Sequence, residues 1–314
     1  MAAADLVRTP EGAMAVVRRA SAKVEEQDEL YYARWTAKDP ALFAVASKVG
    51  VFGFAKGRPA LSAVAETVNL GFLGTDNKHY VSLYNPGLWA PFGKLPAGMV
   101  QNQAFGPSPV TLTANPPESY AVYVGDDGQL YYSHKAGPGS IWEASSGSPA
   151  QSLSTTVSPV AVIDGQADLV IAYVRKDGQI ALIKLLTPMN AWSSEVLVHP
   201  QALTSSAIAL LRLDAGGYAL AWRGLDTQGI YLALSVGDTF DKWSLPIIIE
   251  GPKLTSTPPV LVHGVIGAEL EILFTTGSKL RHARVSAGQV VAPVDVVGIA
   301  TATTVAASRV QLGG

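Results

Sequence analysis

The chain has 314 residues, 48% of them hydrophobic and 15% charged, and this composition excludes an intrinsically disordered protein. Its 23 basic and 25 acidic residues give a net charge of −2, without the basic excess typical of proteins that bind nucleic acid or anionic membranes. The lack of cysteine excludes disulfides, thiolate nucleophiles and cysteine-bound zinc. Because the chain shows neither an apolar signal segment nor a run of about 18 apolar residues, we expect a cytoplasmic protein with no membrane partner.

A 50-residue repeat runs along the chain. Short runs of aromatic and branched residues, typical of strands, begin at Leu30, Tyr80, Leu130, Ile180, Ile230 and Leu280. Turn-forming Gly, Asn and Asp precede several of these runs, as at 126–128, and predict a hairpin from a preceding strand. Apolar runs further upstream predict a first strand, and a tryptophan series leads into a fourth: Trp89, Trp142, Trp192 and Trp243.

Four short antiparallel strands in about 50 residues are typical of a β-propeller blade. Six repeats fill the chain, so we expect an all-β, six-bladed β-propeller that forms a single domain over residues 1–314. The segment from Ser308 to Gly314 has the pattern of a first strand with no second strand after it. The runs from Met14 and Leu30, in turn, have no first strand in phase before them, so we expect the C-terminal strand to pair with the N-terminal blade and close the ring. The tryptophan series is expected to pack between blades.

Motifs of catalysis and metal binding are missing from the sequence. It contains no phosphate-binding loop, dinucleotide fingerprint, zinc-protease helix, nucleophile elbow or calcium loop. Its five histidines do not cluster along the chain, so we expect no metal and no cofactor. The carboxylates at 25–29 and at 126–127 fall in predicted hairpins, where solvated turn residues are more typical than the paired acid and base of a glycosidase. Hydrolysis by paired carboxylates therefore remains a minor hypothesis.

The succession of a strand, a Gly/Asp turn and a strand followed by Trp resembles the six-bladed fungal fucose-specific lectins. That family holds fucose between blades with an Arg on the second strand, a Glu two residues into the third strand and an aromatic residue beyond. In the 50-residue register the positions of the Arg are occupied by Ala20, Leu70, Tyr120, Val170, Leu220 and Leu270. The positions of the Glu are occupied by Tyr32, Ser82, Tyr132, Leu182, Leu232 and His282. The sugar-binding residues of the family are thus replaced at all six sites.

Repeated positions of this chain are apolar or turn-forming, whereas its polar positions differ from repeat to repeat. A multivalent lectin repeats one polar constellation, so this pattern favours one asymmetric site, expected in the funnel where first strands converge. Polar candidates on the first strands are Arg58, Ser62, Thr111, Thr113, Asp164, Arg212, Asp214, His263, Arg309 and Gln311. Trp222 lies outside the tryptophan series and is a candidate to line the pocket; Tyr132 and His282 complete the substrate-binding set.

As a whole, the chain resembles fungal propeller proteins of natural-product pathways, in particular the hetero-Diels–Alderases that join a tropolone quinone methide to a humulene-type sesquiterpene. This resemblance implies a cofactor-independent pericyclase with a small apolar substrate. Orientation and hydrogen-bond polarisation suffice for a cycloaddition, and Arg212, His263 and Arg309 would polarise a carbonyl oxygen. The alternative is a carbohydrate-binding lectin with non-standard sugar sites. Stoichiometry separates the two hypotheses, because a lectin binds about one ligand per blade and a cyclase one per chain.

Overall fold

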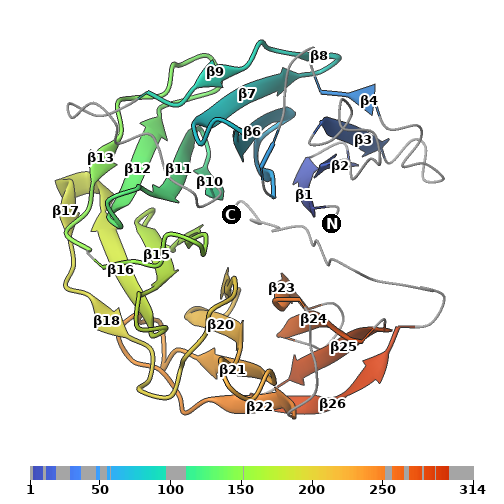
Figure 1. The fold of residues 1–314 in the computed structure, drawn as a ribbon, viewed down its shortest axis with the longest axis vertical. Helices are drawn as coiled ribbons and strands as arrows, with labels where there is room; N and C mark the ends of the chain where they lie inside the picture. Colours follow the sequence, from blue (N-terminus) through green and yellow to red (C-terminus); the bar gives the residue numbers. More distant parts are fainter. Residues whose placement is uncertain are drawn as a thin grey trace. The chain divides into compact units, whose positions relative to one another are not determined.

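The computed structural model describes residues 3–9, 12–18, 29–36, 47–49, 55–56, 58–96, 111–150, 152–251, 257–264, 269–277, 279–286 and 288–296. These residues form antiparallel sheets in two compact units, one containing Met1–Gln151 and the other Ser152–Arg309 (Figure 1). We describe each unit by itself. Within the described ranges there is no α-helix, and the one 3₁₀ turn spans Thr187–Met189.

The first unit contains three sheets within its described residues. The first sheet has the order β1 (Ala3–Thr9), β2 (Gly12–Arg18), β3 (Leu30–Thr36) and β4 (Ser47–Lys48). The second has β5 (Ala60–Val64), β6 (Thr67–Leu73), β7 (His79–Asn85) and β8 (Leu88–Trp89), with β9 (Gly93–Lys94) also paired to β7. The third has β10 (Thr111–Asn115), β11 (Glu118–Val124), β12 (Leu130–Lys135) and β13 (Ser146–Gly147). Strand β5 lies next to both β1 and β10, so the first strands of the three sheets are neighbours.

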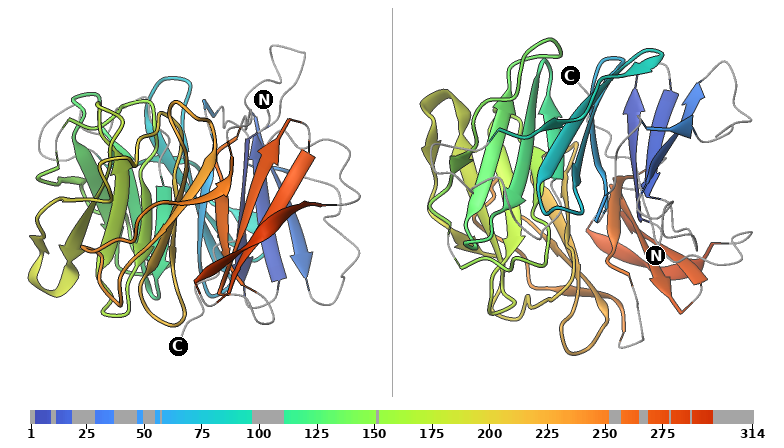
Figure 2. Two further views of the ribbon diagram at one scale, coloured as in Figure 1. Left: turned by 90° about the horizontal axis from the view of Figure 1, so that it is seen from below. Right: turned by 45° about the horizontal axis from the view of Figure 1, so that its top comes forward.

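The second unit repeats this arrangement in its described part. The fourth sheet has β14 (Val160–Ile163), β15 (Leu169–Val174), β16 (Ile180–Leu186) and β17 (Ala191–Trp192), with β18 (Val196–Leu197) also paired to β16. The fifth has β19 (Ala209–Arg212), β20 (Tyr218–Arg223), β21 (Ile230–Leu234) and β22 (Ile247–Glu250). The sixth has β23 (Val260–His263), β24 (Leu270–Thr276), β25 (Lys279–Ser286) and β26 (Gln289–Asp295), and its twist is visible in Figure 2. Strand β19 lies next to β14 and β23.

The predicted hairpins between second and third strands are confirmed, and the turn between β11 and β12 shows their chemistry. Gly125 donates its N–H to the carbonyl of Gln129 at 2.9 Å, and Gly128 has a φ of 73°, which residues with a side chain rarely adopt. Asp127 accepts hydrogen bonds from the Gln129 N–H at 3.0 Å and from the Tyr131 hydroxyl at 2.6 Å. This carboxylate therefore stabilises a turn, in agreement with the expectation for the hairpin carboxylates.

Hydrophobic cores lie between neighbouring sheets of each unit. In the first unit one cluster joins the first and second sheets and another joins the second and third. In the second unit the clusters join the fourth to the fifth sheet and the fifth to the sixth. Trp89, Trp142 and Trp243 pack against these clusters, as the tryptophan series predicts. Each fully buried Leu, Val or Ile contributes about 1.5–3 kcal/mol through the hydrophobic effect, so these layers hold the sheets of a unit together.

The N-terminal sheet differs from the sequence prediction. We expected no first strand before Met14, but β1 pairs with β2 from Ala3 opposite Arg18 to Thr9 opposite Gly12. The expectation is wrong because β1 is only partly apolar and falls outside the 50-residue register. The first sheet thus obtains its four strands from one stretch of chain. The predicted C-terminal strand, Ser308 to Gly314, lies outside the described residues.

Candidate functional site

A network of charged residues lies between the fourth and fifth sheets of the second unit, around Lys184 of β16. The Lys184 ammonium lies 2.6 Å from Asp164 Oδ2 and 3.0 Å from Asp168 Oδ2. Both carboxyl groups are nearly buried, with 6% and 5% of their side-chain surface exposed. Burial by itself would lower the pKa of Lys184, but its hydrogen bonds to the two carboxylates raise that pKa above the usual range. Lys184 is therefore a fixed positive charge held by two anions.

Asp164 is positioned by the turn between β14 and β15. Its Oδ1 accepts the N–H groups of Gln166 at 2.7 Å and of Asp168 at 3.0 Å. Asp168 Oδ1 in turn accepts the N–H of Thr187 at 3.1 Å. Because backbone hydrogen bonds fix both carboxylates, the position of Lys184 is determined by the turn and not by the flexible lysine chain.

The fifth sheet contributes Arg212, Tyr218, Asp238 and Phe240 to the same network. The Arg212 guanidinium hydrogen-bonds the Asp238 carboxylate and the carbonyl of Gly217, and it lies over the Tyr218 ring at 5.0 Å. Burial, followed by the negative charge of Asp164, raises the pKa of Tyr218 above its usual value. Lys184 lies 5.8 Å from the centre of the Phe240 ring. The network thus combines fixed donors, fixed acceptors and aromatic faces between two sheets.

The three predicted donors are not found in a common arrangement. Arg212 belongs to the network just described, whereas His263 Nδ1, at the end of β23, lies 3.1 Å from Asp214 Oδ1. Arg309 lies outside the described residues. Each described donor lies near a different carboxylate, so the structure does not bring the two donors together.

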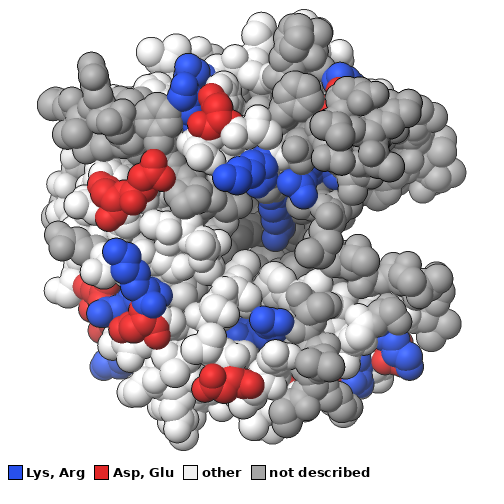
Figure 3. Space-filling model, in the orientation of Figure 1, with Lys and Arg blue, Asp and Glu red and all other residues white. Residues whose placement is uncertain are grey.

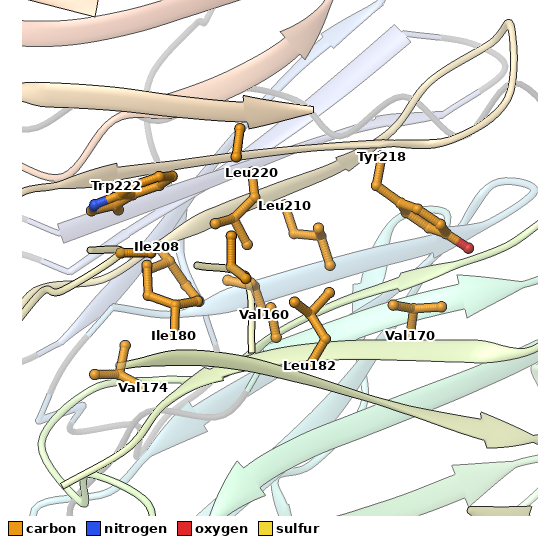
Figure 4. Packing of buried hydrophobic residues seen from close by; sticks show 14 of the residues in the cluster. Val160, Val170, Val174, Ile180, Leu182, Ile208, Leu210, Tyr218, Leu220 and Trp222 are labelled. Carbon is orange, nitrogen blue, oxygen red and sulfur yellow. The ribbon is translucent and has the colours of Figure 1, made fainter. Parts of the chain in front are cut away.

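Trp222 does not line an accessible pocket. It is 1% exposed and stacks on Tyr231 with ring centres 5.7 Å apart, inside the core between the fourth and fifth sheets. Figure 4 shows Trp222 and Tyr218 at opposite ends of this cluster. Of the other five second strands, β2 carries Val17 at the matching place, and four carry an aromatic residue there that is always buried: Phe72, Tyr123, Tyr173 and Phe274. This second-strand series was the sequence signal that identifies Trp222 as a core residue.

The remaining predicted ligand-binding residues are distributed over other sheets. Thr111 and Thr113 are buried in β10, at 8% and 7% exposure. Tyr132 is half-buried in β12, and burial raises its pKa. His282 Nε2, in β25, lies 3.1 Å from Glu271 Oε2. The described structure does not unite these residues in one pocket.

Sequence analysis missed a repeated polar position, which is the fifth residue of five third strands and the sixth residue of β25. The strand pairings align Arg34, Leu83, His134, Lys184, Leu234 and Arg284 at this position, so four of the six residues are basic or imidazole. Each of these four lies near a carboxylate. Arg34 is 3.3 Å from Glu66, and Arg284 is 3.3 Å from Glu271. His134 is 3.3 Å from Glu143 and 3.7 Å from Glu118, and Lys184 is near Asp164 and Asp168. The residue type varies and the carboxylates come from different elements, which is why no simple motif marks the position.

The position of Arg34, between the first and second sheets, shows the same combination with a larger aromatic group. Tyr32, Tyr84 and Trp89 form a cluster in which ring centres lie 5.2–5.8 Å apart. Arg34 lies over the Tyr84 ring at 5.8 Å, and Glu66 of the second sheet is its ion-pair partner. Trp89 is partly exposed, and about a quarter of the surface of Arg34 and of Glu66 is accessible. A cation, a carboxylate and aromatic rings thus meet between sheets in both units.

Figure 3 shows Lys and Arg side chains beside Asp and Glu side chains at several places on one face.

Among the described residues, no group of three or more His, Asp or Glu side chains has the geometry to hold a metal ion. The described part of the chain also contains no helix that is long and apolar enough to cross a membrane.

The sheets and their connections define a six-bladed β-propeller, and comparison with solved structures supports this class. The BP39L lectin from Burkholderia pseudomallei matches with a TM-score of 0.74 and 14% identity, over 94% of this chain and 84% of the lectin. The fungal lectin of Aleuria aurantia, described as a six-bladed β-propeller with a novel fucose recognition mode, matches with a TM-score of 0.57 and 16% identity, over 93% and 95% of the two chains. The SapL1 lectin in complex with alpha methyl fucoside matches with a TM-score of 0.60 and 11% identity, over 96% of both chains. No protein-family model and no curated protein sequence matches the chain.

These comparisons confirm the predicted fold and its similarity to fucose-binding lectins. They contradict the expectation of a hetero-Diels–Alderase, because the similar structures named above are lectins and give no support to an enzyme. The argument for a single asymmetric site is weakened as well, since a polar position does recur along the third strands.

Proposed function

We propose that the protein is a carbohydrate-binding lectin with sites between neighbouring sheets, of which those at Arg34 and Lys184 are best defined. The observation that carries this proposal is the recurrent cation on the third strand, which has a carboxylate and an aromatic ring beside it in each of these two sites. The fold of fucose-binding lectins is consistent with the proposal.

The chemistry of this combination suits a sugar. A guanidinium or ammonium donates to hydroxyl oxygens, a carboxylate accepts from hydroxyl groups, and such charge-assisted hydrogen bonds are about twice as strong as neutral ones. An aromatic face packs against the apolar C–H surface of a sugar ring. At Arg34 these roles fall to Arg34, Glu66 and Trp89; at Lys184 they fall to Lys184, Asp164 and Phe240. The proposed ligand is therefore a small polar ring with apolar faces. This sugar takes the place of the apolar substrate that we expected from the sequence.

Repetition adds to affinity. Two similar sites on one chain allow the protein to bind a surface that displays many sugars about 10²–10⁴ times more tightly than a single site would.

The positions that hold Arg and Glu in the fucose-specific lectins carry other residues here, so fucosides are the first probes and not the assumed ligand. Cytoplasmic localisation stays a prediction.

The test is an array of fucosylated and other glycans, probed with the labelled protein at micromolar concentration and followed by titration calorimetry with any glycan that binds. We expect more than one bound sugar per chain and a weaker signal in Arg34→Met and Lys184→Met. Lys94→Met, which removes an exposed lysine of β9, is the matched control. Silence across the array, or identical binding by both site variants, would refute the proposal.

A further inference from the structure

Lys135, the last residue of β12, is a buried cation between the second and third sheets of the first unit. It is 3% exposed, although lysine is almost never fully buried without an ion partner. Its ammonium donates to Asn69 Oδ1 of β6 at 3.1 Å. Asn69 is itself 2% exposed, and its Nδ2 donates to Ser119 Oγ of β11 at 3.0 Å. The Asn69 amide is therefore oriented with its oxygen toward the ammonium.

The surroundings of Lys135 differ from those of the repeated cations. Arg34 and Lys184 each have a carboxylate within ion-pair distance, whereas the described residues place none within that distance of Lys135. The hydrogen bond that Lys135 donates to Asn69 Oδ1 uses one of the three N–H donors of its ammonium. Burial lowers the pKa of Lys135, and no carboxylate contributes to raise it. A buried ammonium with so few partners costs stability, and a site that recognises an anion offers a reason for that cost.

The position of Lys135 corresponds to an aromatic position in the Arg34 site. Tyr123 pairs with Tyr131 in the third sheet as Phe72 pairs with Tyr80 in the second. Counted from these pairs, Lys135 is equivalent to Tyr84.

The neighbouring tryptophans match as well. Tyr84 lies 5.2 Å from the Trp89 ring, and the Lys135 ammonium lies 5.9 Å from the Trp142 ring. A lysine thus replaces the tyrosine beside the tryptophan, while Leu83 stands at the place of Arg34.

We propose that Lys135, Asn69, Ser119 and Trp142 form a site for an anionic sugar, one that carries a carboxylate or a sulfate group. The Lys135 ammonium pairs with the oxyanion, and the Trp142 ring packs on the apolar face of the sugar. Trp142 lies in the connection between β12 and β13, next to Ile141, which is 87% exposed. Because Lys135 is 3% exposed, an acidic sugar would reach its ammonium only after the Trp142 side chain moves. The inference rests on the proposed lectin function, but it concerns a different pair of sheets and a different ligand charge.

The experiment compares N-acetylneuraminic acid and galactose 6-sulfate with neutral galactose, by titration calorimetry and by the change in tryptophan fluorescence. Free acetate and free sulfate are titrated separately, so that an anion alone is distinguished from an anion on a sugar. We expect at least one acidic sugar to bind more tightly than galactose and than its free anion, and Lys135→Met to weaken it by about 10- to 100-fold. Lys94→Met, with the same change at an exposed position, should bind like the unsubstituted protein.

Lys135→Met is expected to fold, because methionine fills a similar volume without a buried charge. Equal binding by Lys135→Met, binding of free acetate or sulfate as tight as that of the sugar, or no preference for acidic over neutral sugars would overturn the inference. Neutral glycan binding that is lost in Lys184→Met can persist when this inference fails, so the two proposals are tested separately. Failure of the lectin proposal itself appears as silence toward all sugars.

Discussion

Replacing Lys184 with methionine should destabilise the second unit, because it leaves two carboxylates without their shared cation. Asp164 and Asp168 are 6% and 5% exposed and lie 2.6 and 3.0 Å from the ammonium. Breaking a buried ion pair by removing one partner typically costs about 3–5 kcal/mol. Since Lys184 retains 13% of its side-chain exposure and water can reach part of the network, we expect the lower end, about 3 kcal/mol.

A second substitution separates the charge from the packing. Asp164→Asn removes one negative charge but keeps an oxygen that can accept the N–H groups of Gln166 and Asp168. In the Lys184→Met background it should restore about 1–2 kcal/mol, whereas in the unsubstituted protein it should be destabilising, and this difference is the coupling energy of a double-mutant cycle.

Urea unfolding followed by tryptophan fluorescence measures these free energies, with circular dichroism as a second probe to detect separate unfolding of the two units. A loss below about 1 kcal/mol in Lys184→Met would show that the network is a solvated surface pair. Absence of recovery on adding Asp164→Asn would show that lost packing, and not orphaned charge, causes the instability.

The remaining predictions concern the core, a surface pair and pH. Trp222→Ala should lower the free energy of unfolding by about 3–5 kcal/mol in the same urea titration, because the indole is buried; a loss below about 1 kcal/mol would contradict its place in the core. Arg212→Met should cost at most about 1 kcal/mol, since its partner Asp238 is 64% exposed. Because the pKa of Lys135 is lowered, the folded state binds fewer protons than the unfolded state at pH values between that pKa and the usual 10.5. The free energy of unfolding should therefore rise with pH in this range, and the rise should vanish in Lys135→Met. The raised pKa of Lys184 has the opposite sign: its stabilisation is present below 10.5 and is lost as pH rises through the raised pKa, a loss that Lys184→Met should not show.

The repeat was predictable because strand alternation and turn chemistry are local properties. Several hairpins have Gly, Asn or Asp at fixed places, and Gly128 and Gly178 adopt the positive φ that these turns need. Strand β1 was missed because a partly polar run outside the repeat register carries no such signal.

The sites were less predictable because their residues meet through pairing between different parts of the chain. Glu66 and Arg34 are 32 residues apart in sequence, and the residue at the repeated position varies between Arg, His and Lys. The partners of Lys135 are of the same kind, since Asn69 precedes it by 66 residues. A search of one sequence for a repeated residue type does not detect such a site, because the residue type changes from sheet to sheet and its carboxylate partners come from different elements.

The pairing of β1 with β2 has a consequence for how the protein folds during synthesis. Every described sheet takes its strands from one continuous stretch, the first from Ala3 to Lys48 and the last from Val260 to Asp295. Contacts within a sheet are therefore local in sequence, and low contact order favours rapid folding. A sheet can form as soon as its segment has left the ribosome, and the apolar face that it exposes is covered when the next sheet emerges. Translation order and packing order coincide within each unit, which shortens the time for which aggregation-prone edges are exposed.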